Sequence, residues 1–236
     1  MGQKVILITG ASGGLGSAMS EFLYNQGHKL VLHSNKGKIK LPESKNLFHV
    51  KANLRDEKEV IQMFKKIEGV VGGVDILINN AGISKSGISW KTPLDEWQET
   101  IDVNLTAVFL TTKLSIPNMR KNKWGRIINI SSIVGQTGFV GTVAYAASKA
   151  GLLGITKTLS KELASANITV NSLALGYFNQ GMIRDVPEEL KNEIIADIPM
   201  KKLGDPETIC KTIDLLISDE GEYITGQTIN LNGGLN

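Results

Sequence analysis

The sequence predicts an α/β fold in which one doubly wound parallel sheet of about seven strands carries helices on both faces. Short β-branched runs alternate with longer amphipathic segments along the whole chain, and such alternation is typical of parallel strands joined by right-handed crossovers. The chain has 236 residues, 42% of them hydrophobic, which is enough for one large core. No repeat, linker or low-complexity tract divides it, so we expect a single domain over residues 1–236.

Seven short runs have the length and β-branched composition of strands. They are Lys4 to Thr9, Lys29 to His33, Leu47 to Lys51, Asp75 to Asn79, Gly125 to Ile130, Ile168 to Leu175 and Thr228 to Asn230. Five longer stretches predict helices: Gly14 to Gln26, Asp56 to Glu68, about Pro93 to Asn122, Tyr145 to Ala164 and Asp205 to Ile217. The stretch from Ser34 to Asn46 is polar, contains glycine, proline and four lysines, and predicts a basic loop.

Charge and cysteine content exclude several classes of protein. A formal net charge of +3 is too small for this length to indicate a nucleic-acid-binding face. Cys210 is the only cysteine, so neither an intramolecular disulfide nor a cysteine-rich zinc site can form. The N-terminus shows no secretory signal and no apolar stretch reaches membrane-spanning length. We therefore expect a cytoplasmic protein with no nucleic-acid or membrane partner.

A glycine-rich turn follows the first predicted strand and leads into a helical segment. It reads Thr9-Gly10-Ala11-Ser12-Gly13-Gly14-Leu15-Gly16. Glycines let the backbone approach a pyrophosphate, and the free N–H groups at a helix N-terminus favour its negative charge. The turn predicts a Rossmann-like dinucleotide site contacted by Gly10, Ser12, Gly13, Gly14, Leu15 and Gly16. A merely structural turn is the alternative.

The spacing of these glycines differs from G-x-G-x-x-G and resembles the T-G-x-x-x-G-x-G turn of the short-chain dehydrogenase/reductase family. The resemblance covers essentially the whole chain. It continues through Asn79-Asn80-Ala81-Gly82, Asn104, Ser132, Tyr145-Ala146-Ala147-Ser148-Lys149 and Gly226-Gln227-Thr228-Ile229-Asn230-Leu231-Asn232-Gly233-Gly234. It implies an NAD(P)(H)-dependent oxidoreductase that moves a hydride between nicotinamide and a carbonyl or alcohol carbon.

Three residues form the candidate catalytic centre. Tyr145 and Lys149 are four apart at the start of a helix and so share one face. A nearby ammonium lowers the pKa of a tyrosine, and the resemblance makes Tyr145 the proton donor and Lys149 also a ligand of the nicotinamide ribose. Ser132 ends a strand thirteen residues before Tyr145 and is expected to donate to the substrate oxygen. Its neighbour Ser131 faces the other side of the strand and is expected to be structural.

Asn104 completes the predicted catalytic set. The resemblance implies that it holds a water connecting Lys149 to solvent, whereas an ordinary core asparagine is the alternative. This chemistry requires no metal. The three histidines, His28, His33 and His49, do not form a ligand motif and are read as ordinary strand or surface residues.

The end of the second strand indicates which cofactor is preferred. A fold that binds NAD usually places Asp or Glu there to bind the ribose 2′-hydroxyl. This chain has Ser34, Asn35 and Lys36 instead, which together with Lys38 could donate to a 2′-phosphate. NADP(H) is therefore expected, with NAD(H) as the alternative. Two features weigh against it: the lysines could form a simple solvated loop, and Gly13 stands where many NADPH-using relatives have arginine.

The remaining cofactor contacts follow from the resemblance. They are Asn53 and Leu54 for the adenine, Asn80, Ala81 and Gly82 after the fourth strand, and Gly176, Phe178 and Gln180 after the sixth, together with Tyr145 and Lys149. Leu175 and Gln180 replace the proline and threonine that the family usually has near this glycine. We expect Tyr177 and Phe178 to shape an aromatic pocket in this altered loop.

Residues 135–141 and the Gly125-Arg126 pair resemble bacterial 3-oxoacyl-acyl-carrier-protein reductases of fatty acid biosynthesis. The expected substrate is thus a 3-oxoacyl thioester of acyl-carrier protein or coenzyme A, and basic residues Lys121, Lys123 and Arg126 near the cleft would suit an acidic carrier. Two alternatives remain open. One is reduction of another small carbonyl, steroid-like or sugar-like substrate, and the other is a non-enzymatic nucleotide-sensing module.

Two apolar stripes predict self-assembly. They lie around Val103, Ala107, Phe109 and Leu110 and along residues 151–155, and they exceed what one sheet face can cover. In the family these helices pair across a two-fold axis, and the helix from Asp205 with the final strand forms a second contact. We expect a homotetramer, with burial of both stripes in the core as the alternative.

Overall fold

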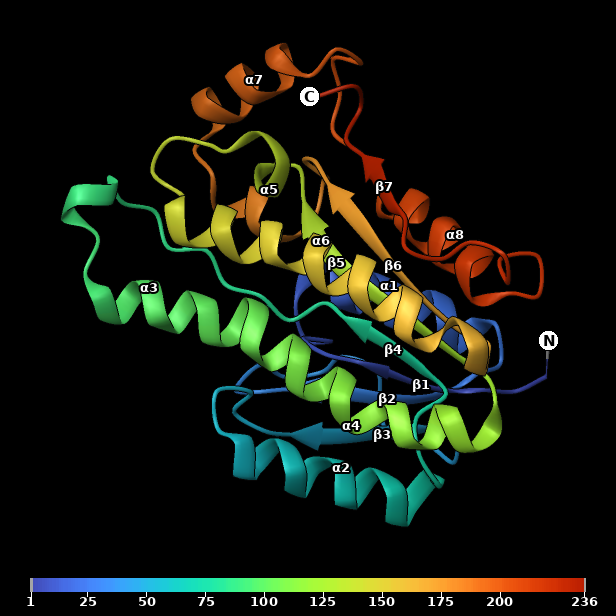
Figure 1. The fold of residues 1–236 in the computed structure, drawn as a ribbon. Helices are drawn as coiled ribbons and strands as arrows, with labels where there is room; N and C mark the ends of the chain where they lie inside the picture. Colours follow the sequence, from blue (N-terminus) through green and yellow to red (C-terminus); the bar gives the residue numbers. More distant parts are fainter. Residues whose placement is uncertain (1, 236) are drawn as a thin grey trace.

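The computed structural model describes residues 2–235. Its sheet has seven parallel strands in the order β3-β2-β1-β4-β5-β6-β7 (Figure 1). The strands are β1 (Val5–Ile8), β2 (Lys29–Ser34), β3 (Leu47–Lys51), β4 (Ile76–Asn79), β5 (Gly125–Ser132), β6 (Ile168–Leu175) and β7 (Thr228–Leu231). The predicted fold class is confirmed, and each strand end lies within two residues of its predicted position.

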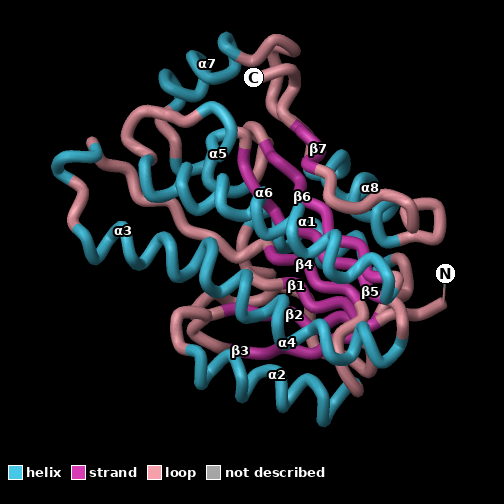
Figure 2. Tube along the Cα trace, in the orientation of Figure 1, coloured by secondary structure: helices cyan, strands magenta, loops and turns pink. Residues whose placement is uncertain are grey.

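Helices cover both faces of the sheet, as Figures 1 and 2 show. The α-helices are α1 (Gly14–Asn25), α2 (Glu57–Val71), α3 (Leu94–Ile101), α4 (Ala107–Asn122), α5 (Val134–Thr137), α6 (Val143–Leu163), α7 (Glu188–Asp197) and α8 (Pro206–Ile217). Short helical turns are η1 (Ser89–Lys91), η2 (Asp102–Thr106), η3 (Ala164–Ala166) and η4 (Gly181–Asp185).

Strand alternation divides the core into two layers. On one face Ile6, Leu30 and Ile78 pack with residues of α1 and α8, whereas on the other Leu7 and Val31 pack with residues of α2 and α4. All of these strand side chains are 0 or 1% exposed. A sheet buried on both faces explains why its strands are hydrophobic without interruption.

The long predicted helix from Pro93 to Asn122 is interrupted. It begins at Leu94 and runs as α3 to Ile101, passes through the π-helical segment η2 around Asn104, and continues as α4. A π segment inside an α-helix is frequent at functional sites. The sequence did not indicate this interruption, since the segment keeps helical composition.

Helix α7 was not predicted, because most of its residues are polar. Pro187 precedes it and Glu188 and Glu189 occupy its first turn, which is the usual pattern of a helix start. The basic loop predicted after β2 is confirmed as non-helical, with only an isolated bridge between Ser44 and Leu47. Within residues 2–235 no helix is long and apolar enough to cross a membrane.

Candidate active site

A cleft of about 1420 Å³ opens at the carboxyl ends of the strands. The strand order reverses here between β1 and β4, the usual ligand position in open α/β sheets. Most residues predicted from the sequence line it: Gly10, Ser12, Gly13, Gly14, Leu15, Gly16, Asn35, Lys36, Asn53, Leu54, Asn80, Ala81, Gly82, Ser132, Tyr145, Lys149, Gly176, Phe178 and Gln180. Ser34 and Asn104 do not line it.

The glycine-rich turn can be built only from glycine at its key positions. Gly10 has a φ of 66°, and a Cβ there would lie 2.8 Å from Ala81 Cα. A Cβ on Gly14 would lie 2.6 Å from the backbone nitrogen of Gly181. Gly13 differs, because its Cβ would meet only a carbonyl oxygen at 3.4 Å. The turn is therefore packed against neighbouring backbone. It leads into the N-terminus of α1, whose first residues Gly14, Leu15 and Gly16 line the cleft, and a helix N-terminus favours the negative charge of a pyrophosphate.

The loop after β4 is tied to this turn by hydrogen bonds. The Asn80 side chain donates to the carbonyls of Thr9 and Gly10 at 2.9 and 3.1 Å. The hydroxyl oxygen of Thr9 accepts from the backbone N–H groups of Asn80 and Ala81, both at 3.0 Å. These bonds hold two sides of the cleft at a fixed separation, a role of Thr9 that sequence reasoning missed.

Tyr145 and Ser132 meet in the cleft. Burial raises the pKa of Tyr145, a hydrogen bond from the Ser132 hydroxyl opposes that rise, and the nearby Tyr177 phenol adds to it. Ser132 closes β5, and its oxygen also accepts from the N–H of Val134 at 3.2 Å. Ser131 points elsewhere, since its hydroxyl donates to the Lys149 carbonyl at 2.9 Å and joins β5 to α6.

Lys149 is 4% exposed, and its ammonium donates to the Ile130 carbonyl at 2.8 Å. Burial lowers the pKa of Lys149 from 10.5 to about 8. The ammonium lies 5.6 Å from the centre of the Tyr145 ring. The expectation that this lysine lowers the pKa of Tyr145 is not met in this geometry, because burial of the phenol has the larger effect and the ammonium is engaged by a carbonyl.

Asn104 lies behind the cleft, at the π segment. Its side-chain oxygen accepts from Ile83 N–H at 2.8 Å, and its amide donates to the Ile83 carbonyl at 2.8 Å and to Ser148 Oγ at 3.1 Å. A Cβ placed on Gly82 would lie 3.4 Å from Asn104 Oδ1 and 3.5 Å from Lys149 Nζ. The side chain therefore clamps the loop next to Lys149, and the water-holding role stays a prediction.

Ser34 was predicted to contact the cofactor, but it does not line the cleft. This residue is 1% exposed at the end of β2, so its hydroxyl is directed into the protein rather than toward a 2′-phosphate. Asn35 and Lys36 do line the cleft, together with two cations that sequence reasoning missed, Lys40 and Arg55. Arg55 directly follows Asn53 and Leu54, which were predicted to contact the adenine. Its position in the sequence could therefore have indicated that it lines the cleft.

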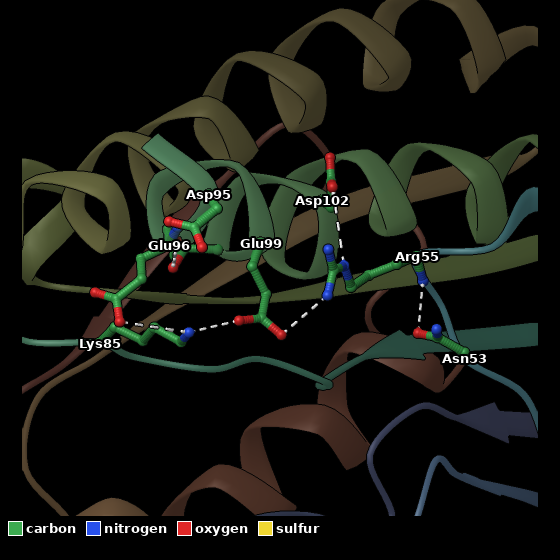
Figure 3. A network of polar contacts seen from close by, with 8 residues as sticks. Asn53, Arg55, Lys85, Asp95, Glu96, Glu99 and Asp102 are labelled. Atoms are coloured by element: carbon green, nitrogen blue, oxygen red, sulfur yellow. Dashed lines mark hydrogen bonds and ion pairs between the residues drawn. The ribbon is translucent and has the colours of Figure 1, made fainter. Parts of the chain in front are cut away.

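Arg55 belongs to a charged network along the rim of the cleft (Figure 3). Its guanidinium lies 3.0 Å from Glu99 and 3.9 Å from Asp102. Lys85 lies 2.6 Å from Glu99 and 3.8 Å from Glu96. The loops after β3 and β4 are thereby joined to α3 and η2, although such partly exposed ion pairs contribute little stability.

The altered loop after β6 forms the substrate side. Tyr177 lines the cleft, and burial followed by the charge of Asp197 raises its pKa. Phe178 also reaches the cleft but is 5% exposed, with its ring against Gly204. Only Tyr177 therefore presents much of its ring to the cavity. Leu190 and Ile194 of α7 add apolar side chains.

The predicted basic patch near the cleft is wrong. Lys121 and Lys123 lie at the end of α4, and Arg126 is at the start of β5, whereas Ser132 ends that strand. Eight strand residues span about 23 Å, so the patch lies at the amino ends of the strands, whereas the cleft lies at their carboxyl ends. Arg126 is only 1% exposed and stacks on Trp124, 4.4 Å from the ring centre.

No group of three or more His, Cys, Asp or Glu side chains within residues 2–235 is arranged to hold a metal ion. Close to the glycine-rich turn the cleft instead holds the phenol of Tyr145, the buried ammonium of Lys149 and the hydroxyl of Ser132. Beside a glycine-rich dinucleotide turn, these groups suit proton transfer coupled to hydride transfer. The fold and site define a nicotinamide-dependent oxidoreductase that acts on carbonyl or alcohol groups.

Comparisons with known proteins agree. A family model described as short chain dehydrogenase matches residues 4–191. The chain is 41% identical to a 3-oxoacyl-[acyl-carrier-protein] reductase of Aquifex aeolicus, covering 98% of this chain and 97% of that protein. It is 42% identical to nodulation protein G of a Rhizobium species over 97% and 95%, and 38% identical to the Staphylococcus epidermidis reductase over 98% of each. The chain belongs to the short-chain dehydrogenase family.

Proposed function

We propose that this protein reduces 3-oxoacyl thioesters to 3-hydroxyacyl thioesters with NADPH. The observation that carries the proposal is the meeting of Ser132, Tyr145 and Lys149 in the cleft that the glycine-rich turn also lines. Relatives bearing the name 3-oxoacyl-[acyl-carrier-protein] reductase match nearly the whole chain, which supports this substrate class.

The residues have distinct parts in the reaction. Ser132 donates a hydrogen bond to the keto oxygen, which gains negative charge as the carbonyl carbon is reduced. Tyr145 delivers the proton that turns this oxygen into a hydroxyl. Lys149, protonated below its pKa of about 8, donates to the nicotinamide ribose. Asn104 holds the loop beside Lys149.

The cofactor contacts are proposed from the lining of the cleft. Gly14, Leu15 and Gly16 present backbone N–H groups to the pyrophosphate, and Asn53 and Leu54 face the adenine. When bound, NADPH supplies the hydride. Lys36, Lys40 and the amide of Asn35 line one end of the cleft, and Arg55 lies there paired with Glu99. The two lysines suit a 2′-phosphate better than a free hydroxyl. NAD(H) remains the alternative cofactor.

A second candidate function is reduction of another small carbonyl compound, steroid-like or sugar-like. The observation that favours it is the altered loop, where Leu175 and Gln180 replace the family's usual residues and Tyr177 adds a hydroxyl to the cleft. A non-enzymatic nucleotide sensor is disfavoured, because it would need the turn but not the Ser132 and Tyr145 pair.

Steady-state NADPH oxidation over a substrate panel separates these candidates. The panel contains acetoacetyl thioesters of coenzyme A and acyl-carrier protein, a ketosteroid and a keto-sugar. We expect the thioesters to have the highest kcat/KM. A keto-sugar or ketosteroid that exceeds both thioesters would contradict the proposed substrate, and NADPH binding without turnover of any of them would favour the sensor.

A carrier-bound substrate, a homotetrameric assembly and a cytoplasmic location complete the proposal. The tetramer is supported by the half-exposed Phe109 on α4, while Ala107 and Leu152 of the same stripes are core residues. The stripes are thus covered in part by the sheet and in part left to a partner. The location rests on the sequence alone.

A further inference from the structure

His33 joins the glycine-rich turn to the end of β3. It lies in β2 and is 2% exposed. Its Nδ1 accepts from the backbone N–H of Gly10 at 3.2 Å, and its Nε2 pairs with the carbonyl of Ala52 at 3.0 Å. Its own carbonyl accepts from the N–H of Ala11 at 2.8 Å. One residue therefore holds two consecutive amides of the turn.

The two backbone partners determine which nitrogen carries the proton. A backbone N–H can only donate and a carbonyl can only accept. Nδ1 of His33 must therefore be unprotonated toward Gly10, and Nε2 must carry the hydrogen toward Ala52. Burial lowers the pKa of His33, and the bond to Ala52 raises it by less, so the ring is neutral at pH 7.

Both backbone polar groups of Gly10 are bonded, by three partners in all. His33 takes its N–H, while its carbonyl accepts from Asn80 Nδ2 at 3.1 Å and from Gly13 N–H at 3.1 Å. At a φ of 66° this residue sets the direction in which the chain leaves β1. The orientation of the following N–H groups depends on the conformation of Gly10, because the turn is only a few residues long.

We propose that His33 is a positioning residue for dinucleotide binding, acting through the Gly10 amide rather than by touching the pyrophosphate. This inference rests on the proposed function, since it assumes that the turn binds NADPH. Loss of the bond to His33 leaves the Gly10 N–H without its acceptor and lets the turn sample orientations that bind phosphate poorly. Loss of the Ala52 bond leaves the turn in place.

Two substitutions separate the two bonds. In His33→Asn the side-chain oxygen can stand at the place of Nδ1 and accept from Gly10, but nothing reaches Ala52. In His33→Gln the amide nitrogen can stand at the place of Nε2 and donate to Ala52, but Gly10 loses its acceptor. Either change removes one buried hydrogen bond of similar kind, so their effects on stability should be comparable.

The test measures the Kd for NADPH by cofactor fluorescence, together with thermal unfolding and kcat at saturating NADPH. We expect His33→Asn to bind within about twofold of the wild type and His33→Gln about five- to tenfold more weakly, the size of one lost hydrogen bond. The kcat at saturation should change little in both. His49→Gln is the matched control, because His49 Nε2 also contacts a backbone carbonyl, that of Leu41, at 2.9 Å, and His49 does not line the cleft.

Nitrogen-15 NMR of the imidazole gives an independent measurement that needs no variant. The proposal requires the neutral ring with hydrogen on Nε2 at pH 7. A ring protonated on Nδ1, or equal NADPH affinities of the Asn and Gln variants, would overturn the role of His33 while leaving the proposed function intact. Wild-type protein that binds no dinucleotide would overturn the proposed function as well.

Discussion

The position of Lys149 has an electrostatic cost for the fold. An ammonium at 4% exposure with no carboxylate partner among the described ion pairs is held only by a carbonyl. Its depressed pKa of about 8 means that the folded protein pays for the charge at neutral pH. Retention of such a group indicates that it serves chemistry rather than stability.

Replacing Lys149 by Met should therefore stabilise the protein and inactivate it. We expect the free energy of unfolding at pH 7 to rise by about 1 to 2 kcal/mol, after allowing for the carbonyl of Ile130 left unpaired. Between pH 8 and 10.5 the unfolded state binds more protons at this position, so wild-type stability gains with pH and the advantage of the Met variant shrinks. Urea unfolding at pH 7 and 9.5 measures both effects, and a less stable Met variant at pH 7 would contradict them.

Cofactor preference is a second property decided by single residues. Asn35 lines the cleft, whereas Ser34 is buried beside it. Asn35→Asp should repel a 2′-phosphate and shift the ratio of kcat/KM values toward NADH by about tenfold or more. Ser34→Asp is the matched control: it places a carboxylate in the protein interior, so it should lower the melting temperature. Equal kcat/KM values for NADH and NADPH in the wild type would contradict the proposed role of Lys36 and Lys40 in binding the 2′-phosphate.

Among the elements, the π segment η2 joins structure to function most closely. It directs Asn104 at the loop after β4, where the side chain makes two hydrogen bonds with Ile83, and a third joins it to Ser148 of α6. Asn104→Ala should lower the free energy of unfolding by about 2 to 4 kcal/mol, because both backbone groups of Ile83 lose their partner. Chemical denaturation with circular dichroism measures this loss. A change below 0.5 kcal/mol would show that the clamp is not needed for the fold.

At this scale the sequence predicted the strands and missed irregular features. Buried β-branched runs determine a strand wherever it lies, so β1 and β6 could be located closely. The π segment, α7 and the burial of Ser34 depend on contacts between distant segments, which no local pattern records. The candidate catalytic residues were predictable as motifs, but the raised pKa of Tyr145 was not, since burial arises only in the folded protein.

Assembly is a property of the whole molecule. Phe109 and Val70 are each 50% exposed, the first on α4 and the second on α2. Light scattering after size exclusion should give about four times the mass of the chain. Phe109→Glu should lower that mass, because a charge at a subunit contact is costly, and Val70→Glu should not. A wild-type monomer with full activity would contradict the tetramer.

The central claim is that one cleft binds NADPH and delivers the proton through Tyr145. Replacing Tyr145 by Phe keeps the ring and removes the phenol, so NADPH should bind as in the wild type. Single-turnover oxidation of bound NADPH by acetoacetyl coenzyme A, followed by absorbance, tests the claim most directly. We predict that the Phe variant reacts at least about a hundredfold more slowly. Equal rates in the two proteins would contradict the account.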